Sequence, residues 1–141
     1  MVLPDVNVLV YAHRRDSAHH DQARSWLAAM LASDQAYGMS ELVVAAFIRI
    51  VTHNRIFNPP STLDQALAFA SDLLTPDHAV PVSPGARHWE IFEKLCRASA
   101  VKGNLVTDAY FAALAIESGC EWISTDGDYA RFQDLSWRRP F

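Results

Sequence analysis

Short apolar runs alternate with helical stripes of apolar residues along this chain. Runs rich in β-branched and aromatic residues predict strands, whereas apolar residues repeating every three or four positions predict helices. The predicted strands are VLPDV (2–6), AYGM (36–39), HAVPV (78–82) and EWIST (121–125). The predicted helices cover 19–33, 41–54, 63–74, 86–99 and 108–118, and a helical turn around 7–14 is left open as the end of the first strand. Strands that alternate with helices predict a three-layer α/β/α sandwich with a mainly parallel central sheet, in a single domain over residues 1–141.

Local signals place the ends of several of these helices. Ser40 is expected to cap the helix over 41–54, and Ser61 or Thr62 caps the next helix after the break at Asn58-Pro59-Pro60. Thr107 is expected to stand just before the helix over 108–118, which Gly119 ends. Trp26 and Trp89 fall on the apolar stripes of their helices, which predicts that both are core residues.

Composition narrows the class of protein. Half of the 141 residues are hydrophobic and 20% are charged, which is typical of a globular chain and argues against disorder. The net charge of −4 argues mildly against a nucleic-acid binder, unless several acids are concentrated at a metal site. The two cysteines form no CxxC pair, and no apolar stretch reaches the roughly 18–20 residues of a membrane span. We therefore expect a soluble cytoplasmic protein.

Five acidic residues stand where other residue types would be easier to place. Asp5 interrupts a buried apolar run, Asp126 and Asp128 follow a strand, and Glu41 and Asp108 each open a helix. Ligand sites in parallel sheets lie at the carboxyl ends of the strands, so Asp5 and Asp126 are expected to converge. Taken singly, the acids that open helices can also serve the helix dipole, and those after the strand can be ordinary turn residues.

Convergence of carboxylates requires compensation. Two carboxylates about 4 Å apart repel by roughly 4 kcal/mol at an effective dielectric constant near 20, so either one is protonated or a cation lies between them. A site made of oxygen ligands suits Mg²⁺ or Mn²⁺. If the strand continues past Asp5, Asn7 lies on the same face and could orient the Asp5 carboxylate or hold a metal-bound water.

Four motifs in order resemble one family. The segments DVNVLVYA, SE, TDAYFAALAIESG and STDGDYARF look like the PIN-domain ribonucleases and, more narrowly, the VapC toxins of bacterial toxin–antitoxin pairs. The resemblance spans essentially the whole chain and implies that the family's acids are Asp5, Glu41, Asp108, Asp126 and Asp128. It also matches Asn7 to the family's asparagine and Ser124 to its motif hydroxyl, where threonine is more usual. Tyr129 stands where phenylalanine is commoner.

The resemblance implies Mg²⁺-dependent hydrolysis of RNA, with inhibition of translation and growth as the outcome. Asp5 and Asp108 would hold the principal ion, Asp126 and Asp128 would complete its surroundings directly or through water, and Glu41 would bind a second ion or help deprotonate the attacking water. The number of ions is open. The resemblance further implies a homodimer and a cognate antitoxin whose tail covers the acidic pocket.

RNA must also be held, and arginine and lysine side chains are the usual means. Arg14 and Arg15 are the preferred pair because they follow the segment that carries Asp5. The other candidates are Arg49, Arg55, Lys102, Arg131, Arg138 and Arg139. The helix over 41–54 and the IFNPP segment after it have more apolar residues than one core face requires, so they form either a partner surface or additional core.

Two rival functions are weighed. A haloacid-dehalogenase-like phosphatase also begins with an aspartate after its first strand, but its general acid two residues later would fall on Asn7, and no suitable lysine follows. A PIN module that binds RNA or a partner without cutting would show binding but no Mg²⁺-dependent strand scission.

Overall fold

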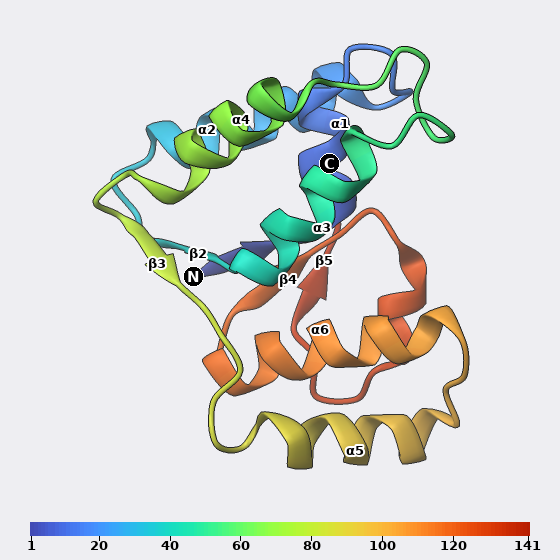
Figure 1. Cartoon of the computed structure of the whole chain (residues 1–141). Coiled ribbons are helices and arrows are strands. Elements are labelled where there is room, and N and C mark those ends of the chain that lie inside the picture. The colour runs from blue at the N-terminus through green and yellow to red at the C-terminus, as the bar shows by residue number, and fades with distance from the viewer.

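The computed structural model describes all 141 residues, and its elements form three layers (Figure 1). Helices α1 to α4 lie on one side of the strands, and α5 and α6 lie on the other. This is the predicted α/β/α sandwich. The elements are β1 (Val2–Pro4), α1 (Val6–His13), α2 (His20–Ala32), β2 (Tyr37–Met39), α3 (Glu41–Val51), α4 (Leu63–Leu74), β3 (Ala79–Pro81), α5 (His88–Ser99), α6 (Asn104–Ser118), β4 (Glu121–Ile123), the 3₁₀ helix η1 (Gly127–Arg131) and β5 (Trp137–Arg138).

The strands are all parallel but form two hydrogen-bonded sheets. One sheet has the order β1-β4-β5 and the other pairs β2 with β3. The two sheets meet where β2 lies beside β1, and Gly38 makes the close approach possible. A Cβ at Gly38 would lie 3.4 Å from the carbonyl oxygen of Val2 and 3.0 Å from a methyl carbon of Val82. Because β1 and β4 are parallel neighbours, their carboxyl ends reach the same edge of the sheet, where the sequence predicts the site.

The first strand is shorter than predicted, and a strand near the C-terminus was not predicted at all. β1 ends at Pro4, and Asp5 caps α1 by accepting a hydrogen bond from the N–H of Val6 at 2.7 Å. The apolar run of residues 6–10 is therefore helical and buries Val8, Leu9 and Val10. β5 has only two residues, and its pairing with β4 depends on tertiary contact rather than on a local apolar pattern.

Three predicted helix ends agree with the structure, since Gly119 ends α6 in the left-handed conformation as expected, and one start differs. Ser40 caps α3, and Thr62 forms a capping box with Gln65 at the start of α4. Helix α6 begins at Asn104, after Gly103, so the expected start near Thr107 is wrong. Asp108, which was predicted to open this helix, thus lies in its second turn, where the helix dipole stabilises a carboxylate only weakly. No helix has the length and apolar character needed to cross a membrane.

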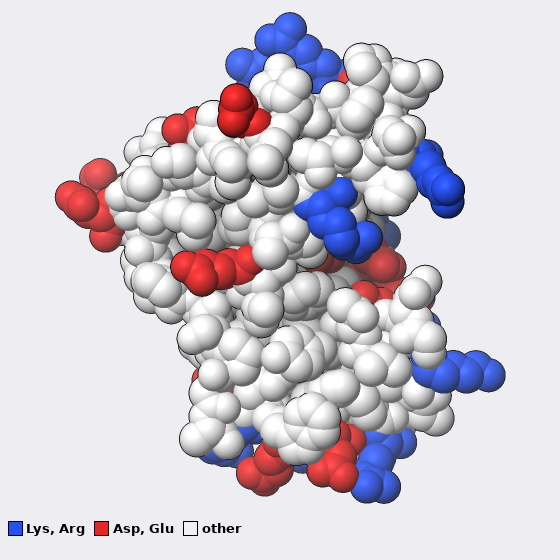
Figure 2. Space-filling view, viewed as in Figure 1, with Lys and Arg blue, Asp and Glu red and all other residues white.

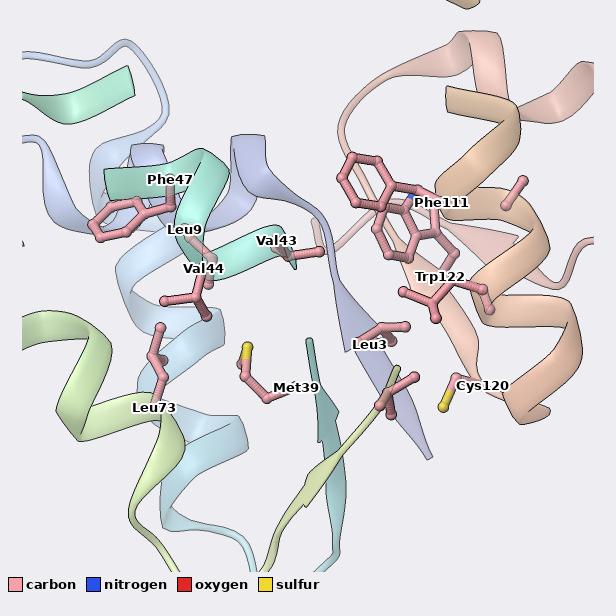
Figure 3. Packing of buried hydrophobic residues seen from close by; sticks show 14 of the residues in the cluster. Leu3, Leu9, Met39, Val43, Val44, Phe47, Leu73, Phe111, Cys120 and Trp122 are labelled. Carbon is pink, nitrogen blue, oxygen red and sulfur yellow. The ribbon is translucent and has the colours of Figure 1, made fainter. Parts of the chain in front are cut away.

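The core lies on both sides of the strands (Figure 3). Trp122 of β4 stacks on Phe111 of α6 at 5.6 Å between ring centroids, while Phe47 of α3 packs in the layer on the opposite side. Trp26 packs against this core, but the prediction for Trp89 is wrong, because its side chain is 67% exposed. Helix α5 is covered on one side only, so a tryptophan at its edge is left in solvent.

The apolar surplus around α3 divides between core and surface. Phe47 and Val51 are fully buried, and Ile48 and Ile50 are partly buried against the core. Ile56, in the segment after the helix, is 51% exposed. The surplus therefore supplies both core and exposed apolar surface.

Candidate active site

The pairing of β1 with β4 brings the first acidic motif to the last one. Pro4 is the register partner of Ile123, and the N–H of Asp5 donates to the carbonyl oxygen of Ile123 at 2.8 Å. Asp5 therefore leaves β1 beside Ser124, which directly follows β4. Two segments more than a hundred residues apart form one edge, as expected for a site in a parallel sheet.

Ser124 uses its whole hydrogen-bonding capacity to hold this edge together. Its hydroxyl donates to Asp5 Oδ2 at 2.6 Å and accepts from Asn7 Nδ2 and from the backbone N–H of Asp126, both at 3.0 Å. Asn7 Nδ2 also donates to Asp5 Oδ2 at 3.0 Å. The carboxylate of Asp5 is thus fixed by a serine hydroxyl, an amide and the N–H of Val6. These donors partly replace the water that Asp5 loses, since the residue is only 6% exposed.

Three of the five predicted acids line one pocket. Asp5 from the end of β1, Asp108 from α6 and Asp126 from the turn after β4 face an open cavity of about 450 Å³. Figure 2 shows acidic side chains deep in a notch between the two halves of the molecule, with basic side chains above it. The residues that line the cavity are Asp5, Val6, Asn7, Val10, Tyr11, Ala46, Arg49, Ile50, Ile56, Phe57, Thr107, Asp108, Phe111, Asp126 and Tyr129.

The acids disturb one another's ionisation. Burial, together with the nearby charges of Asp108 and Asp126, raises the pKa of Asp5 to about 7, although the hydrogen bonds from Ser124 and Val6 act in the opposite direction. Burial and the charge of Asp126 also raise the pKa of Asp108. Clustered carboxylates with raised pKa values mark candidate functional sites, because each would be stabilised by a cation or a shared proton.

The chemistry of this donor set fits a hydrated hard cation. The pocket offers carboxylate oxygens and the amide of Asn7, with no sulfur or imidazole among the lining residues. No group of three or more His, Cys, Asp or Glu side chains is arranged so that it could hold a metal ion. Mg²⁺ commonly binds through one or two carboxylates and keeps several waters, for which an open cavity leaves room. Asp5, Asp108 and Asp126 therefore fit a hydrated ion that one or two of them contact directly, with water between the ion and the others.

Two predicted acids lie outside this lining. Glu41 is the first residue of α3 and is exposed, whereas α3 contributes Ala46 and Arg49 to the cavity from further along the helix. Asp128 is exposed and forms an ion pair with Arg131 at 3.1 Å. Catalytic roles for Glu41 and Asp128, and a metal-binding role for Asp128, stay predictions.

The expectation that Arg14 binds RNA is not supported by its surroundings. Its guanidinium forms an ion pair with Asp16 at 2.6 Å and donates to Ser61 Oγ and to the carbonyl oxygen of Pro59. The side chain is only 12% exposed and covers the ring of Phe57 at 4.3 Å. Arg14 joins the segment before α4 to the end of α1, and its donors are already used within the protein.

Arg15 and Arg49 are the exposed alternatives. Arg15 points to solvent outside the acidic pocket, so its role in RNA binding stays a prediction. Arg49 is the only Lys or Arg that lines the acidic pocket, and it takes part in none of the four ion pairs. The sequence offers Arg49 only as one of several candidates, because Arg14 and Arg15 follow the segment that carries Asp5. The available signal was a basic residue within a helix that is otherwise almost entirely apolar.

Comparison with known proteins shows the family to which this chain belongs. Residues 2–135 match the model of the PIN domain, and the chain therefore belongs to the PIN-domain family. Among curated relatives, ribonuclease VapC25 of Mycobacterium tuberculosis is 41% identical over 99% of each chain. Ribonuclease VapC43 of the same species is 40% identical over 99% of this chain and 95% of its own. These relatives confirm the sequence-based resemblance to the ribonucleases of the VapC type.

Solved structures agree on the fold. The crystal structure of VapBC2 from Rickettsia felis, bound to a promoter DNA fragment, has a TM-score of 0.71 at 17% identity, over 99% of this chain and 98% of that one. VapC20 of M. tuberculosis, described as a Sarcin-Ricin loop cleaving toxin, has a TM-score of 0.66 at 18% identity, over 96% and 98% of the two chains. At this identity the likeness shows a shared fold.

Proposed function

We propose that the protein is a Mg²⁺-dependent endoribonuclease, with Mn²⁺ as a possible substitute, and that it is the toxin of a toxin–antitoxin pair. The observation that carries this proposal is the meeting of Asp5, Asp108 and Asp126 in one open pocket. The ribonuclease names of relatives at about 40% identity support it. Inhibition of translation would follow from cleavage of an RNA that translation requires.

Each residue of the pocket has a role in this proposal. Asp5, Asp108 and Asp126 would hold the divalent ion, directly or through water, while Ser124 and Asn7 keep Asp5 in one orientation. The bound ion would supply positive charge that favours deprotonation of a water and stabilises negative charge on the phosphodiester. The fixed carboxylates hold the reacting groups in place, which is where most of the catalysis of phosphoryl transfer arises.

Arg49 is the basic residue best placed to contact the substrate backbone. It is exposed, it lines the pocket, and its charge is not paired within the protein. A phosphate contact of this kind releases a counterion when RNA binds. Arg49→Ala should therefore weaken RNA binding and reduce the slope of log K against log salt by about one.

The decisive experiment compares Asp5→Asn with the unchanged chain and with Asp64→Asn, a matched change on the exposed start of α4. Each purified protein is incubated with RNA in Mg²⁺ or in EDTA, and the 5′ ends of the products are mapped. We expect Mg²⁺-dependent cleavage by the unchanged chain and by Asp64→Asn, and none by Asp5→Asn. Full cleavage by Asp5→Asn in EDTA would refute the assignment, and RNA binding without scission would favour a non-cutting module.

A cognate antitoxin and a homodimer complete the proposal. The Rickettsia felis neighbour is a VapBC protein bound to promoter DNA, which supports an antitoxin partner for this chain. The exposed apolar residues Leu42, Ile56, Leu63 and Leu67 could contribute to such contacts. Co-expression with the cognate antitoxin should give a complex without ribonuclease activity. Sedimentation equilibrium of the purified chain tests the dimer.

A further inference from the structure

The side chain of Tyr129 forms part of the wall of the acidic pocket. Its ring is 2% exposed and packs between Trp122 and Phe132, with centroids at 5.5 and 6.0 Å. The hydroxyl at its end donates to Asp108 Oδ1 at 3.4 Å. The ring thus belongs to the core, and its polar end belongs to the pocket.

The packing of the ring does not explain the hydroxyl. A phenylalanine would fill the same space beside Trp122 without burying a polar group, which costs stability unless that group is paired. Asp108 is the one side chain to which the hydroxyl is hydrogen-bonded. The indole N–H of Trp122 lies near the same hydroxyl but does not reach full hydrogen-bond geometry with it, so Asp108 is the better-formed partner.

Asp108 has little else to hold it in place. Asp5 accepts hydrogen bonds from Val6, Asn7 and Ser124, whereas the contact with Tyr129 is the one side-chain hydrogen bond of Asp108. That contact involves Oδ1, and it leaves Oδ2 without a partner in the protein. A donor to a carboxylate also favours its ionised form, the form that binds a cation.

We propose that Tyr129 is a positioning residue that holds the carboxylate of Asp108 in one orientation, so that its second oxygen is available to a divalent cation. Residues that donate to a metal-binding carboxylate commonly change metal affinity when they are replaced. The inference rests on the proposed function, because it assumes that Asp108 is a metal ligand. It adds that the hydroxyl of this tyrosine strengthens metal binding.

The test is Tyr129→Phe, which removes one oxygen and keeps the ring. Binding of Mn²⁺ alone is measured without RNA, from the electron paramagnetic resonance signal of the free ion. Because the hydrogen bond is long, we expect affinity to fall by about 3- to 10-fold, at or below the low end of the usual effect of such partners. Tyr37→Phe is the matched control, since it removes a buried hydroxyl that donates to the carbonyl oxygen of Leu73 at 2.8 Å, away from the pocket.

A cycle with Asp108→Asn separates positioning from a general loss of stability. If Tyr129 acts through Asp108, Tyr129→Phe should weaken Mn²⁺ binding in the unchanged chain but have no further effect once Asp108 is replaced. Affinities of Tyr129→Phe and the unchanged chain within twofold, or an equal loss in Tyr37→Phe, would overturn the inference. Failure of the unchanged chain to bind Mn²⁺ would overturn the proposed metal site as well, so the two failures are distinguishable.

Discussion

Replacing Arg14 with alanine should lower the stability of the chain substantially, because this arginine connects α1 to the segment before α4. The interaction with Phe57 and the hydrogen bonds to Ser61 and Pro59 are each worth about 1 kcal/mol for a side chain this buried. The pair with Asp16 adds little to this, since Asp16 is exposed and water screens the pair. We therefore expect a loss on the order of 3 kcal/mol.

The assay is thermal unfolding followed by circular dichroism. A loss of this size lowers the melting temperature by roughly 10 °C in a chain of this length. Arg15→Ala is the matched control: it removes the same charge from an exposed neighbour, and surface changes of this kind usually alter stability by less than about 0.5 kcal/mol.

The result also decides how any RNA defect is interpreted. If Arg14→Ala melts within about 2 °C of Arg15→Ala, the contacts of Arg14 contribute little and the reasoning fails. If Arg14→Ala is destabilised while its RNA binding, measured at a temperature where it is folded, keeps the salt dependence of the unchanged chain, Arg14 is structural. A salt slope reduced by about one in Arg49→Ala alone would then locate the RNA contact at the pocket.

Three further changes test the fold. Glu117 accepts hydrogen bonds at 2.7 and 2.9 Å from backbone N–H groups of the turn before α5, and these bonds lower its pKa. The ionised carboxylate therefore stabilises the fold at a pH above its ordinary pKa. This contribution is lost as the pH falls through the lower pKa of the folded state. Urea unfolding should therefore show a smaller drop in stability between pH 6 and pH 3 for Glu117→Gln, and an unaltered drop would contradict this. Gly38→Ala places a Cβ 3.0 Å from a methyl carbon of Val82 and should cost about 1–3 kcal/mol in the same assay, unless the strands shift without penalty. Thr62→Ala breaks the capping box of α4 and should cost about 1 kcal/mol, whereas Thr62→Ser should restore most of it.

Local sequence patterns determined much of the fold. The helices α2 to α5 and the strands β2 to β4 lie close to where apolar periodicity, caps and proline breaks predict them. The errors fall where neighbours decide the outcome. The run after Pro4, which the sequence leaves open between strand and helical turn, is helical with Asp5 as its cap, and β5 was missed because it is a strand only where β4 offers it a partner. The 67% exposure of Trp89 has the same origin, because an apolar stripe does not show how much of its helix the neighbouring elements cover.

The chemistry of the site was also present in the sequence, because the acids, Asn7 and Ser124 can be recognised by type and order. Which of them meet was decided by the tertiary structure. The register of β1 on β4 places Ser124 on Asp5, and the packing of α6 brings Asp108 to the same cavity. The tertiary structure also uses Arg14 as an internal connection and leaves Arg49 unpaired at the pocket. Patterns along the chain report short-range preferences, whereas contacts between residues more than a hundred positions apart depend on how the layers pack.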